Sequence, residues 1–424
     1  MTRTNQSIGL ALLMTLTFLA CNSVGAETVQ NTPGPKIILG VPVVVSRAPL
    51  GLTKWGPWQF PSIQRLPDGR LQVGYNIGAD SATAYGAQPG VAVSGDDGKT
   101  WTEMKPSDPA FPWVSGLMVL PNGDLLRQVV LRSRKLQDVQ EKLPPPFAIW
   151  TDKLGGKVTT YLAEQMPKDL AGYRFSRLKK GSREWVEETA DVNMPGAVRA
   201  VTNDGNVLVF PWIQRIKIAP DGTLWGIDHS LRVVDGALRT PLAIVFLRST
   251  DYGHTWNFIS EIPYQPDKEA DSLWDKNDGF EEPNITFLPD GSVFCLIRTS
   301  EEKAEPMYQS RSTDNGRTWS KPVVFDDLGV WPALLTLKNG VTLASYGRPG
   351  LYLRATNDPD GRSWGGRVTV VNPGGWGRDT CSYSDLIALD DHSALIAYSD
   401  FNYPDAAGKP RKTILVRKVT LIAK

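Results

Sequence analysis

Three near-identical octapeptides constrain the fold of this chain more than any other feature. Residues 94–101 (SGDDGKTW), 249–256 (STDYGHTW) and 312–319 (STDNGRTW) all read Ser-x-Asp-x-Gly-x-Thr-Trp, a pattern called the Asp box below. The Asp carboxylate can accept hydrogen bonds from N–H groups of its own turn, and the Gly can adopt a positive φ. The Thr then enters a strand and the Trp buries a large apolar surface. The pattern therefore predicts a repeated β-hairpin.

Weaker copies of the box also occur, and the copies alternate along the sequence with a second turn signal. Residues 356–364 hold the box with one inserted residue, and residues 176–185 (SRLKKGSREW) keep its Ser, Gly and Trp without the Asp. The second signal is a turn of the Pro-Asp-Gly type between apolar runs, found at residues 66–69, 120–123, 219–222, 288–291, 337–340 and 389–392. Such runs and turns are typical of hairpins. Six hairpins, five of them followed by a box or its remnant, predict an all-β, six-bladed β-propeller of four-stranded antiparallel blades.

The composition agrees with one domain of short strands. The 424 residues include 14 Trp, 39 Gly and 32 Pro, which suits many strands and turns, and no stretch has a long helical apolar period. A propeller is a single domain despite its length, so we expect residues 27–424 to form one unit. The net charge is +1 and no basic run is longer than a few residues, which argues against a nucleic-acid partner.

Residues 1–26 have the pattern of a signal peptide. The apolar run over residues 8–20 is too short to span a bilayer. Two processing sites compete, because residues 24–26 (VGA) suit ordinary signal cleavage and residues 19–21 (LAC) resemble a bacterial lipobox that ends at Cys21. The simple secreted form is favoured. Both predict export from a bacterial cytoplasm, with membrane contact only through a lipid on Cys21.

Few residues outside the repeats have the chemistry of a cofactor site. Cys295 and Cys381 lie in different predicted blades, and we expect two unpaired thiols. The three His residues are scattered, and neither a metal-ligand cluster nor a Gly-rich phosphate loop is present. We therefore expect no cofactor and no metal, and chemistry carried by carboxylates, Tyr and Arg.

The boxes and hairpins resemble those of the Asp-box (BNR-repeat) sialidases, or neuraminidases, over essentially all of the chain after the signal peptide. This resemblance implies a secreted exo-acting glycoside hydrolase with a retaining mechanism. Residues 381–386 (CSYSDL) are similar to the segment that carries the sialidase nucleophile, which assigns that role to Tyr383. The sialidase substrate bears a carboxylate on its anomeric carbon, and a neutral phenol avoids the repulsion that Asp or Glu would meet. A buried strand Tyr is the alternative interpretation.

The resemblance extends to residues that would assist Tyr383. A phenol with an ordinary pKa of about 10 needs a neighbouring base, and residues 280–284 (FEEPN) resemble the segment that supplies it, with Glu282 in that role. Arg298, across the same predicted hairpin, would be one arm of a carboxylate clamp. Arg348 would be a second arm, and Arg354 is the alternative if the register differs. Guanidinium groups bind carboxylates in bidentate fashion, more selectively than Lys.

Two positions limit what the resemblance implies. Gln59, in residues 58–61 (WQFP), stands where the sialidases have a third clamp arginine, so one positive charge is missing. Asp80 is the only acidic residue between Asp68 and the first box, which makes it the default acid/base that protonates the leaving oxygen. A plain turn Asp is the alternative. Aromatic residues that stack on a sugar are expected among Trp55, Trp58, Trp331 and Trp376.

The sequence thus leaves two alternatives to a sialidase open. Because Gln59 carries no charge, the substrate of a related propeller glycosidase could be a different acidic or neutral glycan. A non-catalytic propeller that binds carbohydrate is the other alternative, although the joint presence of Tyr383, Glu282, Arg298 and Arg348 argues against it. In each case the partner is a glycan or glycoconjugate, and we expect a monomer.

Overall fold

The computed structural model describes residues 34–422, except residues 82–86, 106–115, 130–133, 154, 202–205, 208–212, 300–304 and 376. The expected signal peptide with Cys21 and the aromatic candidate Trp376 lie outside the described residues. The helices within them are single turns: α1 (Leu136–Val139), η2 (Gln140–Lys142), η3 (Ala163–Gln165) and α2 (Lys168–Ala171). None is long and apolar enough to cross a membrane.

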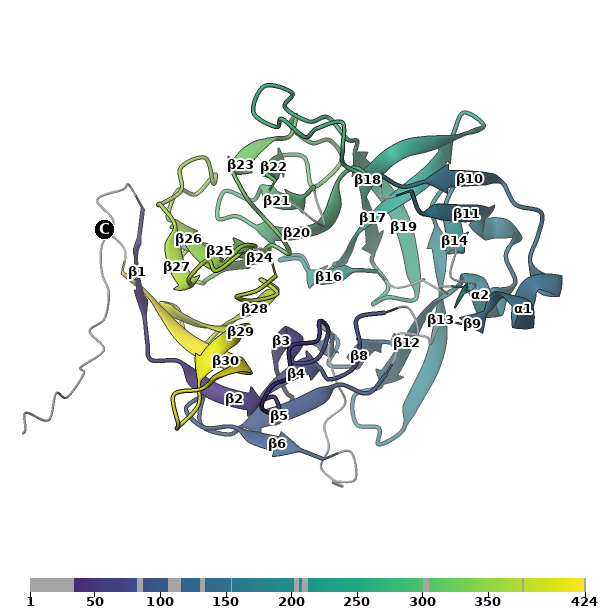
Figure 1. The fold of residues 1–424 in the computed structure, drawn as a ribbon. Helices are drawn as coiled ribbons and strands as arrows, with labels where there is room; N and C mark the ends of the chain where they lie inside the picture. Colours follow the sequence, from purple (N-terminus) through teal and green to yellow (C-terminus); the bar gives the residue numbers. More distant parts are fainter. Residues whose placement is uncertain are drawn as a thin grey trace, which may run out of the picture.

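Antiparallel sheets are arranged around a common centre (Figure 1). Three separate sheets have four strands each. The first contains β3 (Gln59–Arg65), β4 (Leu71–Asn76), β5 (Gly90–Ser94) and β6 (Thr102–Met104). The second contains β20 (Glu281–Phe287), β21 (Val293–Arg298), β22 (Met307–Ser312) and β23 (Val323–Asp326). The third contains β24 (Ala333–Thr336), β25 (Thr342–Gly347), β26 (Leu351–Thr356) and β27 (Val368–Val371).

An eight-stranded sheet joins two further four-stranded units. One unit is β7 (Met118–Val119), β8 (Leu125–Gln128), β12 (Tyr173–Leu178) and β13 (Trp185–Asn193), and the other is β16 (Arg215–Ile218), β17 (Leu224–Val234), β18 (Ala237–Ser249) and β19 (Thr255–Ile262). They meet where β13 pairs in parallel with β19. Smaller sheets come from segments between these strands: β10 (Ala148–Thr151), β11 (Lys157–Leu162) and β14 (Val198–Val201), and the pair β9 (Arg134–Lys135) and β15 (Asn206–Val207). The all-β propeller is confirmed, and the count of six blades stays a prediction.

The last sheet is built from both ends of the described chain. It contains β28 (Ser384–Ala388), β29 (Ser393–Pro404) and β30 (Pro410–Ile422), to which β1 (Lys36–Leu39) and β2 (Val43–Arg47) are added. Both early strands pair with β30, and Figure 1 shows them in purple against the yellow C-terminal strands. This pairing closes the ring of sheets.

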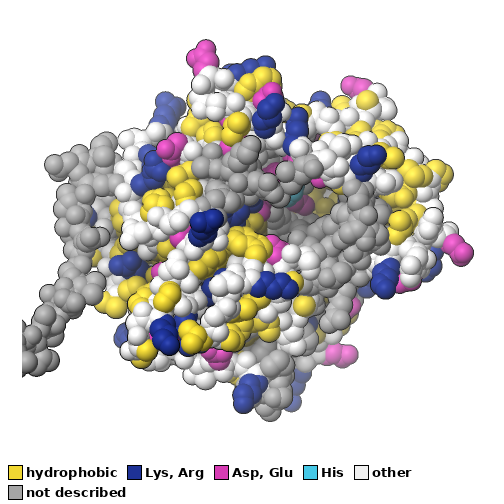
Figure 2. All heavy atoms as spheres, viewed as in Figure 1, with side chains coloured by type: hydrophobic (Ala, Val, Ile, Leu, Met, Phe, Trp, Pro, Cys, Tyr) yellow, Lys and Arg dark blue, Asp and Glu magenta, His cyan; other side chains and the backbone are white. Residues whose placement is uncertain are grey.

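The apolar core lies between neighbouring sheets. Leu343 and Leu353 of one sheet, for example, pack in one cluster with Ile396 and Leu415 of the next. The strands nearest the centre follow one another in space, because β3 lies beside β28, β28 beside β24, β24 beside β20, and β20 beside β16 and β17. The first residues of these inner strands therefore meet near the centre. Figure 2 shows this face hollowed at its centre, with acidic and histidine side chains visible in the hollow.

The Asp boxes form the turns that their sequence predicts. In the first, the Thr100 N–H donates to Asp96 Oδ1 (2.9 Å) and the Thr100 hydroxyl donates to Asp96 Oδ2 (2.6 Å). Gly98 has a φ of +83°, and the matching Trp256 of the second box is completely buried. The hydrogen bonds from Thr100 lower the pKa of Asp96 to about 2, so the stability that they contribute is present above pH 3.8 and is lost as the pH falls towards 2. The boxes join outer strands and are structural.

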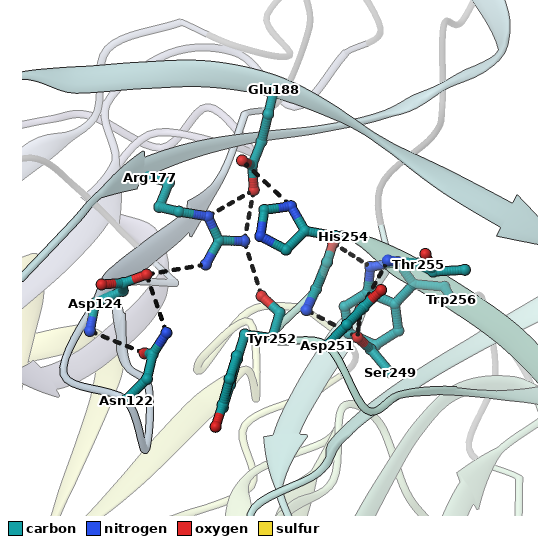
Figure 3. Close-up of polar contacts among 11 residues, drawn as sticks. Asn122, Asp124, Arg177, Glu188, Ser249, Asp251, Tyr252, His254, Thr255 and Trp256 are labelled. Atoms are coloured by element: carbon teal, nitrogen blue, oxygen red, sulfur yellow. Dashed lines mark hydrogen bonds and ion pairs between the residues drawn. The ribbon is translucent and has the colours of Figure 1, made fainter.

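A buried arginine in the box remnant is the centre of a polar cluster (Figure 3). Arg177 of β12 donates to Glu188 Oε1 through Nε (2.9 Å) and a terminal nitrogen (2.5 Å), and to the Tyr252 carbonyl (2.8 Å) of the second box. Its other terminal nitrogen lies 3.6 Å from Asp124 Oδ2, and His254 of the same box lies 3.6 Å from Glu188. The cluster ties the two halves of the eight-stranded sheet together.

We predict that Arg177→Ala lowers the free energy of unfolding by about 2–4 kcal/mol, because it leaves the partly buried carboxylates of Glu188 and Asp124 without their arginine. The Arg177 side chain is only 2% exposed. Urea denaturation followed by circular dichroism measures the change. Arg65→Ala is the matched control, because the Arg65–Asp97 pair is exposed and should contribute at most about 1 kcal/mol. Equal losses in the two variants would contradict this account of the cluster.

Candidate active site

The candidate site lies where the inner strands begin. Phe60 and Glu282 lie at the starts of β3 and β20, Trp331 comes just before β24, and Tyr383 just before β28. Phe60, Glu282 and Trp331 have φ angles of 54°, 41° and 47°, and each precedes a Pro. Left-handed backbone at bulky residues is strained and is concentrated at functional sites. The same local geometry thus presents three side chains to the centre from three different sheets.

Tyr383, Glu282 and Arg298 form one hydrogen-bonded cluster. The Tyr383 hydroxyl donates to Glu282 Oε1. Arg298, at the end of β21, donates through one terminal nitrogen to Glu282 Oε2 (2.5 Å) and to the Tyr383 hydroxyl oxygen (3.2 Å). Arg298 is 2% exposed and Glu282 is 8% exposed. The structure therefore brings together three of the residues that the sequence singled out.

The surroundings set the charge of this cluster. Burial would raise the pKa of Glu282, but the positive charge of Arg298 and hydrogen bonds from Tyr383 and Arg298 outweigh it and lower that pKa below its ordinary value. Burial raises the pKa of Tyr383 well above its ordinary value, and the negative charge of Glu282 adds to this effect. At neutral pH the pair is thus a carboxylate and a neutral phenol, which is the state that proton transfer from Tyr383 to Glu282 requires.

Arg348 is the second arginine at the site. Its guanidinium carbon lies 5.6 Å from the centre of the Tyr383 ring and 5.2 Å from that of Trp55, and one terminal nitrogen donates to the Cys381 carbonyl (2.7 Å). Arg354 lies elsewhere, in β26, where it donates to carbonyls that include that of Gly365 (2.7 Å). The structure therefore places Arg348, and not the alternative Arg354, beside Tyr383.

Aromatic rings hold Tyr383 on two sides. Trp331 stacks on it with 4.5 Å between ring centres and 21° between planes, and Phe60 meets it edge-on at 4.8 Å. Of the other aromatic candidates, Trp55 lies edge-on to Phe60 at 6.0 Å. Trp58 packs against an apolar core cluster and donates to the Ser46 hydroxyl (2.8 Å), so its role is structural.

Asp80 and Gln59 occupy different environments. The Asp80 carboxylate is exposed and accepts a hydrogen bond from the Trp55 indole N–H (2.8 Å). Because the Trp55 ring also contacts Arg348, Asp80 lies on the rim of the site. Gln59 is completely buried, and its side-chain amide has no hydrogen-bond partner among the described residues. Position 59 therefore adds no charge to the site.

Two site residues were missed by sequence reasoning. His229, near the middle of β17, accepts a hydrogen bond at Nδ1 from the Glu282 N–H (3.4 Å), and burial lowers its pKa to about 4, so it is neutral at neutral pH. Arg215 begins β16, and its guanidinium carbon lies 4.0 Å from the centre of the Trp331 ring. The alternation of charged and apolar residues in RIKI (215–218), just before a predicted hairpin turn, is the signal that could have placed Arg215 at the centre.

The two cysteines are inert in this setting. Cys295 and Cys381 are both buried and unpaired, as expected. Burial raises the pKa of each thiol above its ordinary value, so neither is poised as a nucleophile. Within the described part of the chain, no group of His, Cys, Asp and Glu side chains is arranged to hold a metal ion.

Comparisons with known proteins identify relatives of this fold. A family model described as "BNR repeat-like domain" matches residues 183–396. No curated protein matches the sequence. A protein of unknown function from Dyadobacter fermentans DSM 18053 is 19% identical, with a TM-score of 0.63 over 92% of this chain and 100% of that one. This likeness shows a shared fold.

Two other solved structures with lower TM-scores are of enzymes. An alpha-L-arabinanase from Penicillium chrysogenum, solved with arabinobiose, is 15% identical, with a TM-score of 0.48 over 89% of this chain and 98% of that one. The Hadza microbial sialidase Hz136 is 16% identical, with a TM-score of 0.46 over 86% of this chain and 65% of that one.

Proposed function

Because this chain belongs to the BNR repeat-like domain family, we propose that its central site is that of an exo-acting glycoside hydrolase that resembles the sialidases. One observation carries the proposal, which is the hydrogen-bonded cluster of Tyr383, Glu282 and Arg298. A phenol hydrogen-bonded to an ionised carboxylate, with an arginine in contact with both oxygens, is a nucleophile with its base in place. Perturbed pKa values such as those of Tyr383 and Glu282 are concentrated at functional sites.

In the proposed reaction, Tyr383 is the nucleophile. Its oxygen attacks the anomeric carbon while its proton passes to Glu282 Oε1, and the bond from that carbon to the leaving oxygen breaks. Asp80 protonates the leaving oxygen and then, as a carboxylate, takes a proton from water. That water attacks the same carbon, and Tyr383 leaves with the proton from Glu282. Two displacements at one carbon retain its configuration.

The arginines would stabilise negative charge at both stages. Arg298 contacts both the Tyr383 oxygen and the Glu282 carboxylate. Its positive charge therefore stabilises whichever of these two groups is anionic at each stage. Arg348, beside the Tyr383 ring, would hold an acidic group of the sugar with Arg298. Both side chains are almost completely buried, and their positive charges would therefore act strongly on a substrate that excludes water.

The test is hydrolysis by the full chain. Fluorogenic sialosides report release of sialic acid, and mass spectrometry identifies the products released from mixed glycans. Proton NMR during turnover shows the configuration of the first product, which should be retained. An inverted product would contradict the Tyr383 mechanism, and saturable glycan binding without turnover would contradict hydrolysis and support a non-catalytic propeller.

A second candidate substrate is a different acidic or neutral glycan. The buried, uncharged Gln59 favours it, since a pocket with one fewer cation is less suited to a sialic acid carboxylate. In this case the wild type would ignore sialosides and release another sugar.

The variant Gln59→Arg separates the two substrates. Position 59 is completely buried, so we expect the added guanidinium to lower thermal stability and to give no increase in sialoside hydrolysis. Initial rates on a fluorogenic sialoside and thermal unfolding measure the two effects, with Gln64→Arg as the control because Gln64 is a partly buried residue on the same strand. A tenfold rise in sialoside turnover would overturn the second candidate and favour a sialidase.

A further inference from the structure

Arg215 is the third arginine near Tyr383, and it comes from a strand that the sialidase resemblance does not involve. Its guanidinium carbon lies 4.0 Å from the centre of the Trp331 ring, which is over the ring face. Tyr383 is stacked on Trp331 at 4.5 Å. Trp331 therefore contacts both Arg215 and Tyr383 and links the two side chains.

The guanidinium of Arg215 is held in an unusual way. One terminal nitrogen donates to the Pro332 carbonyl (3.3 Å), next in sequence to Trp331, while Nε is buried without a hydrogen-bond partner in the described parts of the chain. No ion pair with a carboxylate is formed within those parts either. A partly buried cation whose Nε has no hydrogen-bond partner and which lies on an aromatic face is costly, and such costs are concentrated at functional sites.

The charge of Arg215 acts on the candidate active site. Burial lowers the pKa of Arg215, and the negative charges of Asp385 and Glu282 act in the opposite direction. The guanidinium is therefore close enough to Glu282 for their charges to interact. Tyr383, Arg298, Arg348 and His229 are other titratable or charged groups of the described chain that face Glu282.

We propose that Arg215 is a positioning residue for Tyr383, which it serves by holding Trp331 against the phenol ring and by adding a positive charge near Glu282. The inference rests on the proposed glycoside hydrolase function and goes beyond it. Tyr383 must point its oxygen at the anomeric carbon, and a ring clamped between Trp331 and Phe60 has little freedom to turn. The cation also favours the ionised form of the neighbouring pair.

The variant Arg215→Met removes the charge and the planar group and keeps much of the volume. The Pro332 carbonyl keeps a donor in this variant, because the Asn284 side chain also donates to it (2.9 Å). We expect kcat to fall by about 10- to 100-fold and KM to change by less than about threefold, because the lost contact acts on Tyr383. Arg215→Lys should recover part of kcat, since it restores the charge without the planar stack.

Lys217 provides a matched control. It is the next cation along β16, and it donates to the Leu334 carbonyl (3.4 Å). Its charge interacts with Arg215 and Asp385, and no contact with Trp331 is recorded in the described structure. Lys217→Met therefore removes a central positive charge without disturbing the ring stack, and we expect kcat to stay within about threefold of the wild type.

A titration without turnover completes the test. With carboxyl-labelled Glu, the resonance of Glu282 is assigned by its absence in Glu282→Gln, and its pKa is followed by NMR. We expect the pKa of Glu282 to rise in Arg215→Met and to stay unchanged in Lys217→Met. An unchanged pKa in Arg215→Met, or equal rises in both variants, would overturn the inference. Because this readout needs no substrate, it decides the inference even if no glycoside is hydrolysed.

Discussion

Replacement of Tyr383 by Phe is expected to lower kcat by about 10³-fold or more, because the variant lacks the oxygen that attacks the anomeric carbon. The Phe ring can keep its contacts with Trp331 and Phe60, so we expect little change in stability. Initial rates on the best substrate from the glycan screen measure the loss.

Tyr398→Phe is the control for this variant. Tyr398 is a buried Tyr of β29, opposite Ser384, and belongs to an apolar core cluster. Its hydroxyl should not affect turnover. If Tyr383→Phe kept wild-type activity, Tyr383 would not be the nucleophile, and the ionised Glu282 would be the remaining group able to attack.

Glu282→Gln is expected to lower kcat by about 10²- to 10⁴-fold, because Gln keeps the shape of the side chain and cannot take the proton of Tyr383. The base must be ionised to act, so wild-type kcat/KM should fall as the pH drops through the pKa of Glu282. Arg298 and Tyr383 hold that pKa below its ordinary value, which places this fall on the acid side of the ordinary Glu range. A pH–rate profile measures both effects.

Glu281→Gln is the matched control, because Glu281 is the neighbouring residue and is also buried. Its side chain is not part of the hydrogen bonds that link Tyr383, Glu282 and Arg298. We expect kcat/KM of Glu281→Gln to fall at low pH in the same way as that of the wild type. Loss of activity in Glu281→Gln with retention in Glu282→Gln would exchange the roles of the two residues and contradict the proposed mechanism.

The sequence was most informative where a residue is tied to a hairpin. Glu282 and Arg298 are sixteen residues apart on two paired strands, so the phase of the hairpin alone brings both to the same end of the sheet. The position of Tyr383 follows from the same phase, because it comes directly before the inner strand β28. The Asp boxes mark where each hairpin lies along the chain, and the contacts between these residues follow from those positions.

Sequence reasoning failed where contacts cross between sheets. Arg215 reaches Trp331, which lies two sheets away around the centre, and no local pattern specifies that distance. The contact between His229 and the Glu282 N–H also joins two sheets, and no local pattern predicts it. The exposure of Asp80 and the burial of Gln59 also depend on packing that no repeat encodes. The extra strands β9, β10, β11, β14 and β15 follow no turn motif and were not expected.

The closure of the ring has a consequence for how this chain folds. Lys36 pairs with Ile422, so the last sheet joins residues separated by almost the entire described chain. The entropy lost in closing so long a loop must be overcome before these contacts can form, and folding slows as contacting residues become more distant in sequence. Each four-stranded sheet built from consecutive strands can form from local contacts. We therefore expect the pairing of β1 and β2 with β30 to be a late event, which leaves an open chain of sheets as the species most exposed to aggregation.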